Sequence, residues 1–312
     1  RRWVEPANWT TPQHFYGLPF WANPPLSMWM SALGMKAFGA NEFGSRIVIF
    51  VPALALLALV ARWASKEWSP KAGIAAVIIL LGSPLFFYCS AGVMTDLPLA
   101  LGTTLAMVAF RLAVKDQSRL WGYLFFVALA IGLLAKGPLA LVIALPPVIG
   151  WTLCTGRYRT VWSSLPWISG TLLMFAISVP WYLLAEKHTP GFLEYFILGE
   201  HWHRFMDSGW KGDLYGKAHP QPPGMIWVFA LAGTFPWCLG FLALPFRQWR
   251  HLKSWALEKE GLGLYLVLWA LWPIVFFTPA RNVIATYPLP AVPAIALLLT
   301  GIRHLRRGTF PT

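Results

Sequence analysis

The stretch GEHWHRF, residues 199–205, concentrates ionisable side chains in a chain that has few of them. Glu200, His201, His203 and Arg204 fill four of five consecutive positions. Imidazole nitrogens and carboxylate oxygens are ligands for zinc and other divalent metals. On a helix, residues two apart point to different sides, so at most one of the two histidines joins a given site. The alternative is a solvated loop, because the spacing matches no recognised closed metal site.

Two further charges stand in or beside long apolar runs. Asp96 lies in GVMTDLPLAL, residues 92–101, and Lys136 lies in LLAKGPLALV, residues 133–142. Charges inside membrane spans are costly and are a functional-site hypothesis by default. A carboxylate there can act as a general base, and a buried ammonium needs an anion such as a lipid phosphate. The structural alternatives are a helix cap for Asp96 and an interfacial, snorkelling Lys136.

Arg281 follows the apolar run 262–278, with Tyr287 shortly after it. A guanidinium group binds phosphate through two parallel hydrogen bonds. The alternative is an arginine that anchors a span at the membrane interface.

The elements that must position these residues are membrane spans. Of the 312 residues, 57% are hydrophobic and 12% are charged, against about 25% charged in soluble domains. A transmembrane helix needs about 20 largely apolar residues, and the sequence predicts an all-α polytopic bundle. The nine predicted spans are 44–64, 72–88, 93–113, 120–135, 138–154, 164–184, 223–245, 262–278 and 284–302.

The chain has a net charge of +13, and fifteen of its 25 basic residues lie in alternate loops between the apolar runs. This distribution favours membrane topology and anionic lipid over nucleic acid as a partner. The positive-inside rule places these loops in the cytoplasm. The long loop 185–222, Asp96, Lys136 and Arg281 then belong to the outer side, and the amphipathic segment 23–39 is predicted to be an interfacial helix.

Other chemistry is excluded by what the sequence lacks. The three cysteines are far apart and form no metal motif, so they indicate small core residues. There is no Walker-type loop, nucleophile elbow or dinucleotide fingerprint. An energised donor would therefore have to arrive already in the membrane, without a nucleotide cofactor.

Five motifs in order carry a family resemblance: HFYGLPFWANPPLSMWMSALGMKAFGANEFGSR, MTDLPLAL, LLAKGPLALV, PWYLLAEKHTPGFLEYFILGEHWHRF and ATYPLP. The series resembles the bacterial GT-C membrane glycosyltransferases of the dolichyl-phosphate-mannose protein mannosyltransferase type, which include the aminoarabinose transferases of lipid A. The resemblance implies one transmembrane domain over residues 1–312, in the inner membrane with its active site facing the periplasm. It implies transfer of a sugar, with inversion, from a polyprenyl-phosphate donor to a protein, lipid A or glycan acceptor.

The resemblance also implies roles for single residues. Asp96 matches the acidic position near the reaction centre and is the predicted catalytic residue. The predicted donor-phosphate ligands are Lys136, Arg281 and Tyr287. His201 and His219 match two histidines that hold a zinc ion in lipid A-modifying relatives.

The sequence departs from the family pattern in two places. Relatives carry a metal-binding Glu and a Lys where this chain has Ala22 and Asn23, so a zinc ion would lack a ligand or recruit Glu200 or Asp213. The family's principal catalytic acid lies on a first outer loop that has no counterpart here, and Glu5 is too close to Trp9 to replace it. We therefore expect a first helix and first outer loop upstream of this sequence.

Two other classes of protein would also carry charges in apolar spans. A transporter or flippase of a lipid-linked substrate would place them at mid-membrane between repeats, and no repeats are visible. A membrane scaffold would leave the outer-side charges without a purpose. The one-sided distribution favours the glycosyltransferase.

Overall fold

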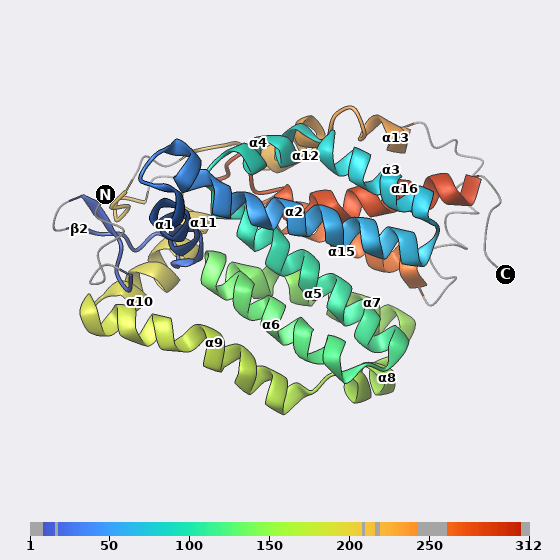
Figure 1. Ribbon diagram of the computed structural model, residues 1–312, viewed down its shortest axis with the longest axis horizontal. Helices are drawn as coiled ribbons and strands as arrows, with labels where there is room; N and C mark the ends of the chain where they lie inside the picture. Colours follow the sequence, from blue (N-terminus) through green and yellow to red (C-terminus); the bar gives the residue numbers. More distant parts are fainter. Residues whose placement is uncertain (1–8, 16–17, 208–209, 216–218, 243–260, 307–312) are drawn as a thin grey trace.

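The computed structural model describes residues 9–15, 18–207, 210–215, 219–242 and 261–306. Its helices run mainly along one long axis and form a bundle (Figure 1). Within these residues, the helices long and apolar enough to cross a membrane are α2 (Glu42–Glu67), α5 (Asp96–Asp116), α6 (Arg119–Lys136) and α9 (Trp167–His188).

A fifth candidate span is bent. Helices α3 (Pro70–Leu81) and α4 (Pro84–Ala91) meet at 70°. The bend falls at Gly82 and Ser83, directly before Pro84, and a proline at the first helical position cannot continue the preceding helix. The predicted single span 72–88 is therefore a broken one.

The remaining apolar runs form shorter helices. They are α7 (Leu139–Thr155), α12 (Met225–Thr234), α13 (Leu239–Leu242), α15 (Leu262–Phe277) and α16 (Val292–Arg306), with the 3₁₀ turn η6 (Leu289–Ala291) before α16. Each predicted apolar run contains helix among the described residues, but length and composition identify four or five spans there, so the number nine is not confirmed.

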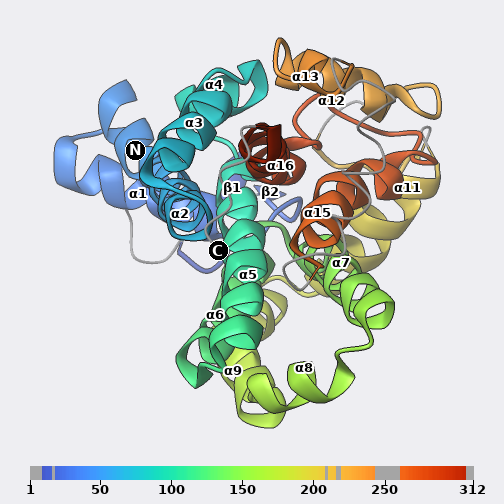
Figure 2. The same cartoon turned by 90° about the vertical axis from the view of Figure 1, so that its right-hand side faces the viewer.

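Helix α5 forms the centre of the bundle. Of its most apolar 18-residue window 89% is buried, against 28% for α9, so α5 is enclosed by protein while α9 has a broad outward apolar face. Figure 2 shows α5 with α2 and α3 on one side and α7 and α15 on the other. A Cβ at Gly102 of α5 would lie 2.8 Å from the backbone nitrogen of Gly132 of α6, so the absent side chain lets the two backbones pack closely.

This close antiparallel pair determines where the candidate charges lie. Asp96 is the first residue of α5 and Lys136 is the last residue of α6. The short connection between the helices forces both ends to the same end of the bundle.

Small elements gather at that same end (Figure 1). They are the strands β1 (Gln13–Phe15) and β2 (Leu18–Pro19), helices α1 (Leu26–Phe38), α10 (Phe192–Glu194) and α11 (Arg204–Met206), and the π-helix η3 (Tyr195–His203). The predicted helix within 23–39 is confirmed as α1, and its interfacial position stays a prediction. The predicted loop 185–222 instead begins inside α9 and contains α10, η3 and α11. The two-stranded sheet has no counterpart in the sequence-based prediction.

The far end of the bundle is closed by α8 (Tyr158–Ser164) and by two ion pairs between α2 and α5. Lys66 pairs with Asp116 at 3.1 Å and Lys115 pairs with Glu67 at 2.9 Å. Glu5 and the basic segment 247–259, used for the topology prediction, lie outside the described residues.

Candidate active site

The centre of the site is an ion pair between the ends of α5 and α6. Nζ of Lys136 lies 2.5 Å from Oδ1 of Asp96, and the two side chains are only 13% and 8% exposed. The hydroxyl of Thr286 donates to the other Asp96 oxygen at 3.2 Å. The ring of Tyr287 lies 4.8 Å from Lys136 Nζ, which is cation–π distance. Neither structural alternative holds, since the carboxylate binds Lys136 and the ammonium is turned inward.

A backbone break places Lys136. Gly137 ends α6 with φ 69° and ψ −150°, a conformation essentially restricted to glycine. Helix α7 starts two residues later at Leu139. The break leaves the Lys136 carbonyl outside the helical hydrogen-bond ladder, where it faces Nε2 of His201 at 3.3 Å.

His201 projects inward from the π-helix η3. Its Nδ1 lies 2.7 Å from the Phe196 carbonyl. Burial lowers the pKa of His201 more than the facing carbonyls of Phe196 and Lys136 raise it. A neutral imidazole has one N–H, and the shorter contact, to Phe196, is the better hydrogen bond. His203 stacks on Trp210 instead, at 5.9 Å between ring centroids, so the two histidines separate as the i, i+2 spacing predicts.

Arg204 supplies a second cation that the sequence reasoning did not select. Its Nη1 lies 2.7 Å from Glu200 and its Nη2 lies 3.7 Å from Asp213. Tyr195 donates to the other Glu200 oxygen at 3.0 Å, and burial raises the pKa of this phenol. Nε of Arg204 is buried and has no hydrogen-bond partner among the described residues. The two carboxylates therefore hold the guanidinium in place through its terminal nitrogens.

These groups line one cavity of about 460 Å³. Its polar lining includes both cations, the carboxylates of Asp96 and Glu200, and the two histidines of the predicted metal site. Its apolar lining includes side chains from α7, α15 and the segment before η6. The lining residues are Ala22, Asn23, Thr95, Asp96, Lys136, Pro138, Leu139, Val142, Phe196, Glu200, His201, Trp202, Arg204, Phe205, His219, Phe276, Phe277, Asn282, Ile284 and Tyr287.

Arg281 is not among these lining residues. Its side chain is exposed, and its carbonyl accepts a hydrogen bond from the Gln221 amide at 2.9 Å. Pro220 pairs with Asn282 in an antiparallel bridge. Neighbouring residues of an extended strand point to opposite faces, so Asn282 faces the cavity and Arg281 faces away. The structure therefore puts Arg204, and not Arg281, in the same cavity as Lys136.

The three positions that the resemblance assigns to zinc do converge on the cavity. Ala22, His201 and His219 all line it, but alanine has no ligand atom. The described residues contain no group of three His, Cys, Asp or Glu side chains placed to hold a metal ion. Glu200 is committed to Tyr195 and Arg204. The side chains present do not fit a zinc ion, and the zinc prediction is not confirmed.

The fold and the site define a polytopic helical membrane protein with a two-cation cavity at one end of the bundle. Residues 22–183 match the family described as dolichyl-phosphate-mannose-protein mannosyltransferase. The chain belongs to this family, as its sequence motifs predict.

Relatives and solved structures agree with this assignment. The undecaprenyl phosphate-alpha-4-amino-4-deoxy-L-arabinose arabinosyl transferase of Edwardsiella ictaluri is 30% identical over 96% of this chain and 53% of its own length. The enzyme of the same name from Erwinia tasmaniensis is 30% identical over 97% of this chain and 53% of its own length. The chain thus spans about half the length of these relatives.

The crystal structure of ArnT from Cupriavidus metallidurans bound to undecaprenyl phosphate matches with a TM-score of 0.81 and 21% identity. The match covers 98% of this chain and 54% of that one. The apo structure of the same protein gives a TM-score of 0.80. These matches confirm the all-helical GT-C-type fold.

Proposed function

We propose that this chain carries the donor-binding part of a glycosyltransferase that takes a sugar from a polyprenyl-phosphate carrier. The observation that supports this best is the cavity lined both by two cations and by apolar side chains. A lipid phosphate has the matching chemistry, because its charge needs cations and its chain needs an apolar path. The names of the relatives and the bound ArnT structure point to undecaprenyl phosphate as the carrier.

Lys136 and Arg204 are the proposed phosphate ligands. In the transfer, the bond between the sugar anomeric carbon and the carrier phosphate breaks while an acceptor oxygen bonds to that carbon from the opposite face. The leaving phosphate gains negative charge, and fixed cations in a partly dry cavity stabilise that charge. Tyr287 packs on Lys136 and keeps its ammonium beside the cavity.

Asp96 has the contacts of a positioning residue. Both of its oxygens already accept hydrogen bonds, one from Lys136 and one from Thr286. A carboxylate held in this way orients the ammonium, while proton abstraction from an acceptor would require it to give up a donor. Its role as the base stays a prediction of the sequence.

The cavity lies at one end of the bundle, which we propose faces the periplasm of a bacterial inner membrane. The sugar would be 4-amino-4-deoxy-L-arabinose or a related sugar, and the acceptor a protein, lipid A or a glycan. The proposed chemistry needs neither a nucleotide nor a metal.

The test is binding of radiolabelled undecaprenyl phosphate to the purified chain in detergent. Arg204→Ala and Lys136→Ala should each weaken binding by roughly 10-fold or more, since a hydrogen bond to a charged group contributes about 1.5–3 kcal/mol. Arg281→Ala is the matched control, because it removes an exposed cation outside the cavity, and should change binding less than about 2-fold.

Equal losses in all three variants would show that the cavity does not select the phosphate. A second measurement is sugar transfer to membrane extract. Movement of the labelled lipid across a bilayer without transfer would instead support the flippase alternative.

A further inference from the structure

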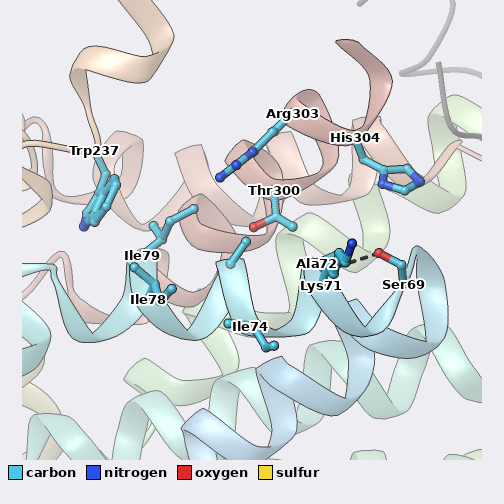
Figure 3. Close-up of a pocket in the computed structure, with 11 residues that line it drawn as sticks. Ser69, Lys71, Ala72, Ile74, Ile78, Ile79, Trp237, Thr300, Arg303 and His304 are labelled. Atoms are coloured by element: carbon cyan, nitrogen blue, oxygen red, sulfur yellow. Dashed lines mark hydrogen bonds between the residues drawn. The ribbon is translucent and has the colours of Figure 1, made fainter. Parts of the chain in front are cut away.

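A second cavity lies outside the proposed active site, on the flank of the bundle between α3 and α16 (Figure 3). It has a volume of about 600 Å³. One side is a row of aliphatic residues from α3, including Ile74, Ile78 and Ile79. The indole of Trp237 closes one end of the groove, where it packs against Gly82. The aliphatic lining of such a groove, on the lipid-facing side of a bundle, is complementary to a hydrocarbon chain.

The opposite end of the groove is basic. Ser69, Lys71 and His304 line it there, at the N-terminus of α3 and in the last turns of α16, and Arg303 extends from α16 over the middle of the groove (Figure 3). The side chains of Lys71 and Arg303 are exposed, and neither has an ion-pair partner among the described residues. Two other cations at this end of the bundle are paired, Lys66 with Asp116 and Lys115 with Glu67. Two cations that line an apolar groove and have no ion-pair partner among the described residues are complementary to a single anionic head group.

The length of the groove matches one leaflet of a bilayer. Its aliphatic row follows α3, which has 12 residues and is therefore about 18 Å long. Half of a hydrocarbon core of about 30 Å is about 15 Å. The basic mouth lies at the bundle end opposite the Asp96–Lys136 pair, so a lipid with its head there would leave its tail between α3 and α16.

We propose that this groove binds one anionic diacyl glycerophospholipid, with its phosphate between Lys71 and Arg303 and an acyl chain along α3 toward Trp237. The site is distinct from the donor cavity and takes lipid from the other leaflet. A lipid bound there contacts both α3 and α16. Helix α3 belongs to the broken span, and α16 is the helix that follows Tyr287 and η6. A zwitterionic lipid binds less well than an anionic one, because its head group brings a positive charge next to Lys71 and Arg303.

The test is native mass spectrometry of the purified full chain titrated with phosphatidylglycerol or phosphatidylcholine of identical acyl chains. One phosphatidylglycerol should stay bound at concentrations at least about 10-fold lower than phosphatidylcholine requires. Lys71→Ala/Arg303→Ala should remove this preference. Arg62→Ala/Arg119→Ala is the matched control, since it removes two exposed cations at the same end that do not line the groove, and should retain it.

A steric variant tests the acyl path separately. Ala75→Trp keeps both cations and fills the groove, so it should lower retention of phosphatidylglycerol. If the double variant does not fold, a salt titration of the wild type replaces it. The preference must then fall as ionic strength rises, because the screening length shrinks from about 10 Å at 0.1 M to about 3 Å at 1 M.

Three results obtained with the two test lipids would overturn the proposal. They are equal retention of the two lipids by the wild type, equal loss of preference in the groove and control double variants, and unchanged retention in Ala75→Trp. Displacement of phosphatidylglycerol by stoichiometric undecaprenyl phosphate would also overturn it, by assigning the groove to the carrier.

Discussion

At the residue scale, the buried pair of Asp96 and Lys136 affects both the stability of the folded protein and the proposed binding of the lipid phosphate. Each charge is taken out of water, and each compensates the other. Removing one partner of a buried pair leaves an unpaired charge, which costs about 3–5 kcal/mol. Replacing both partners by neutral groups of similar shape removes that penalty.

We therefore expect Lys136→Met to lower the thermal unfolding temperature sharply and Asp96→Asn/Lys136→Met to recover most of the loss. The double variant should still fail to bind undecaprenyl phosphate, because the cation is gone. Thermal unfolding in detergent and the binding assay measure the two effects. A double variant as unstable as the single one would mean that the pair does not act as a unit.

His201 gives a pH dependence whose sign follows from its burial. Its pKa in the folded protein lies below its ordinary value of 6.5. Between these two values the unfolded chain binds more protons than the folded one, so the stability contribution is present above 6.5 and is lost as the pH falls. The wild type should therefore lose more thermal stability than His201→Gln between about pH 7.5 and about pH 5.5.

The exposed neighbour provides the control for this experiment. His203→Gln should follow the wild-type pH dependence, since His203 stacks on Trp210 outside the cavity. If His201→Gln and the wild type lose stability in parallel, His201 is not the titrating group.

At the scale of elements, the glycine between α6 and α7 holds the site together. A Cβ on Gly137 would lie 2.5 Å from the Phe196 ring and 3.3 Å from His201. The positive φ with ψ near −150° adds strain of about 1–3 kcal/mol for any other residue. A single methyl group there would displace η3 from the Lys136 carbonyl.

Gly137→Ala should therefore lower the unfolding temperature and weaken carrier binding together. Gly156→Ala is the matched control, because Gly156 also ends a helix at positive φ but has nothing within 4 Å of a new Cβ. It should cost about 1–2 kcal/mol of stability and leave binding unchanged. Equal binding losses in the two variants would show that the packing of η3 against Gly137 does not determine carrier binding.

The same elements show what the sequence could and could not predict. Asp96 and Lys136 stand out because a lone charge in an apolar run needs a reason, and the antiparallel pairing of α5 and α6 then brings them together. Arg204 does not stand out, since a cation in a polar stretch is ordinarily solvated. The sequence points to Arg281 instead, because it follows an apolar run and matches a family position. The bridge between Pro220 and Asn282, which turns Arg281 away from the cavity, is a long-range pairing that no local pattern encodes.

At the scale of the whole molecule, the bundle has two chemically different ends. One end carries the candidate active-site cavity, and the other carries the α2–α5 ion pairs and the basic end of the groove between α3 and α16. Loops rich in lysine and arginine are retained in the cytoplasm. The orientation that this rule predicts puts the cavity in the periplasm. A lipid-linked donor can react there without a nucleotide cofactor.

This orientation can be measured with two matched surface residues in a chain whose three cysteines are replaced by alanine. Lys187, in the last turn of α9, lies at the cavity end, and Arg159, in α8, lies at the other; both are exposed. A membrane-impermeant maleimide should label Lys187→Cys in intact spheroplasts and label Arg159→Cys only after permeabilisation. Both variants should react fully in detergent, which controls for accessibility. The reverse pattern would place the cavity in the cytoplasm and would contradict transfer on the periplasmic face.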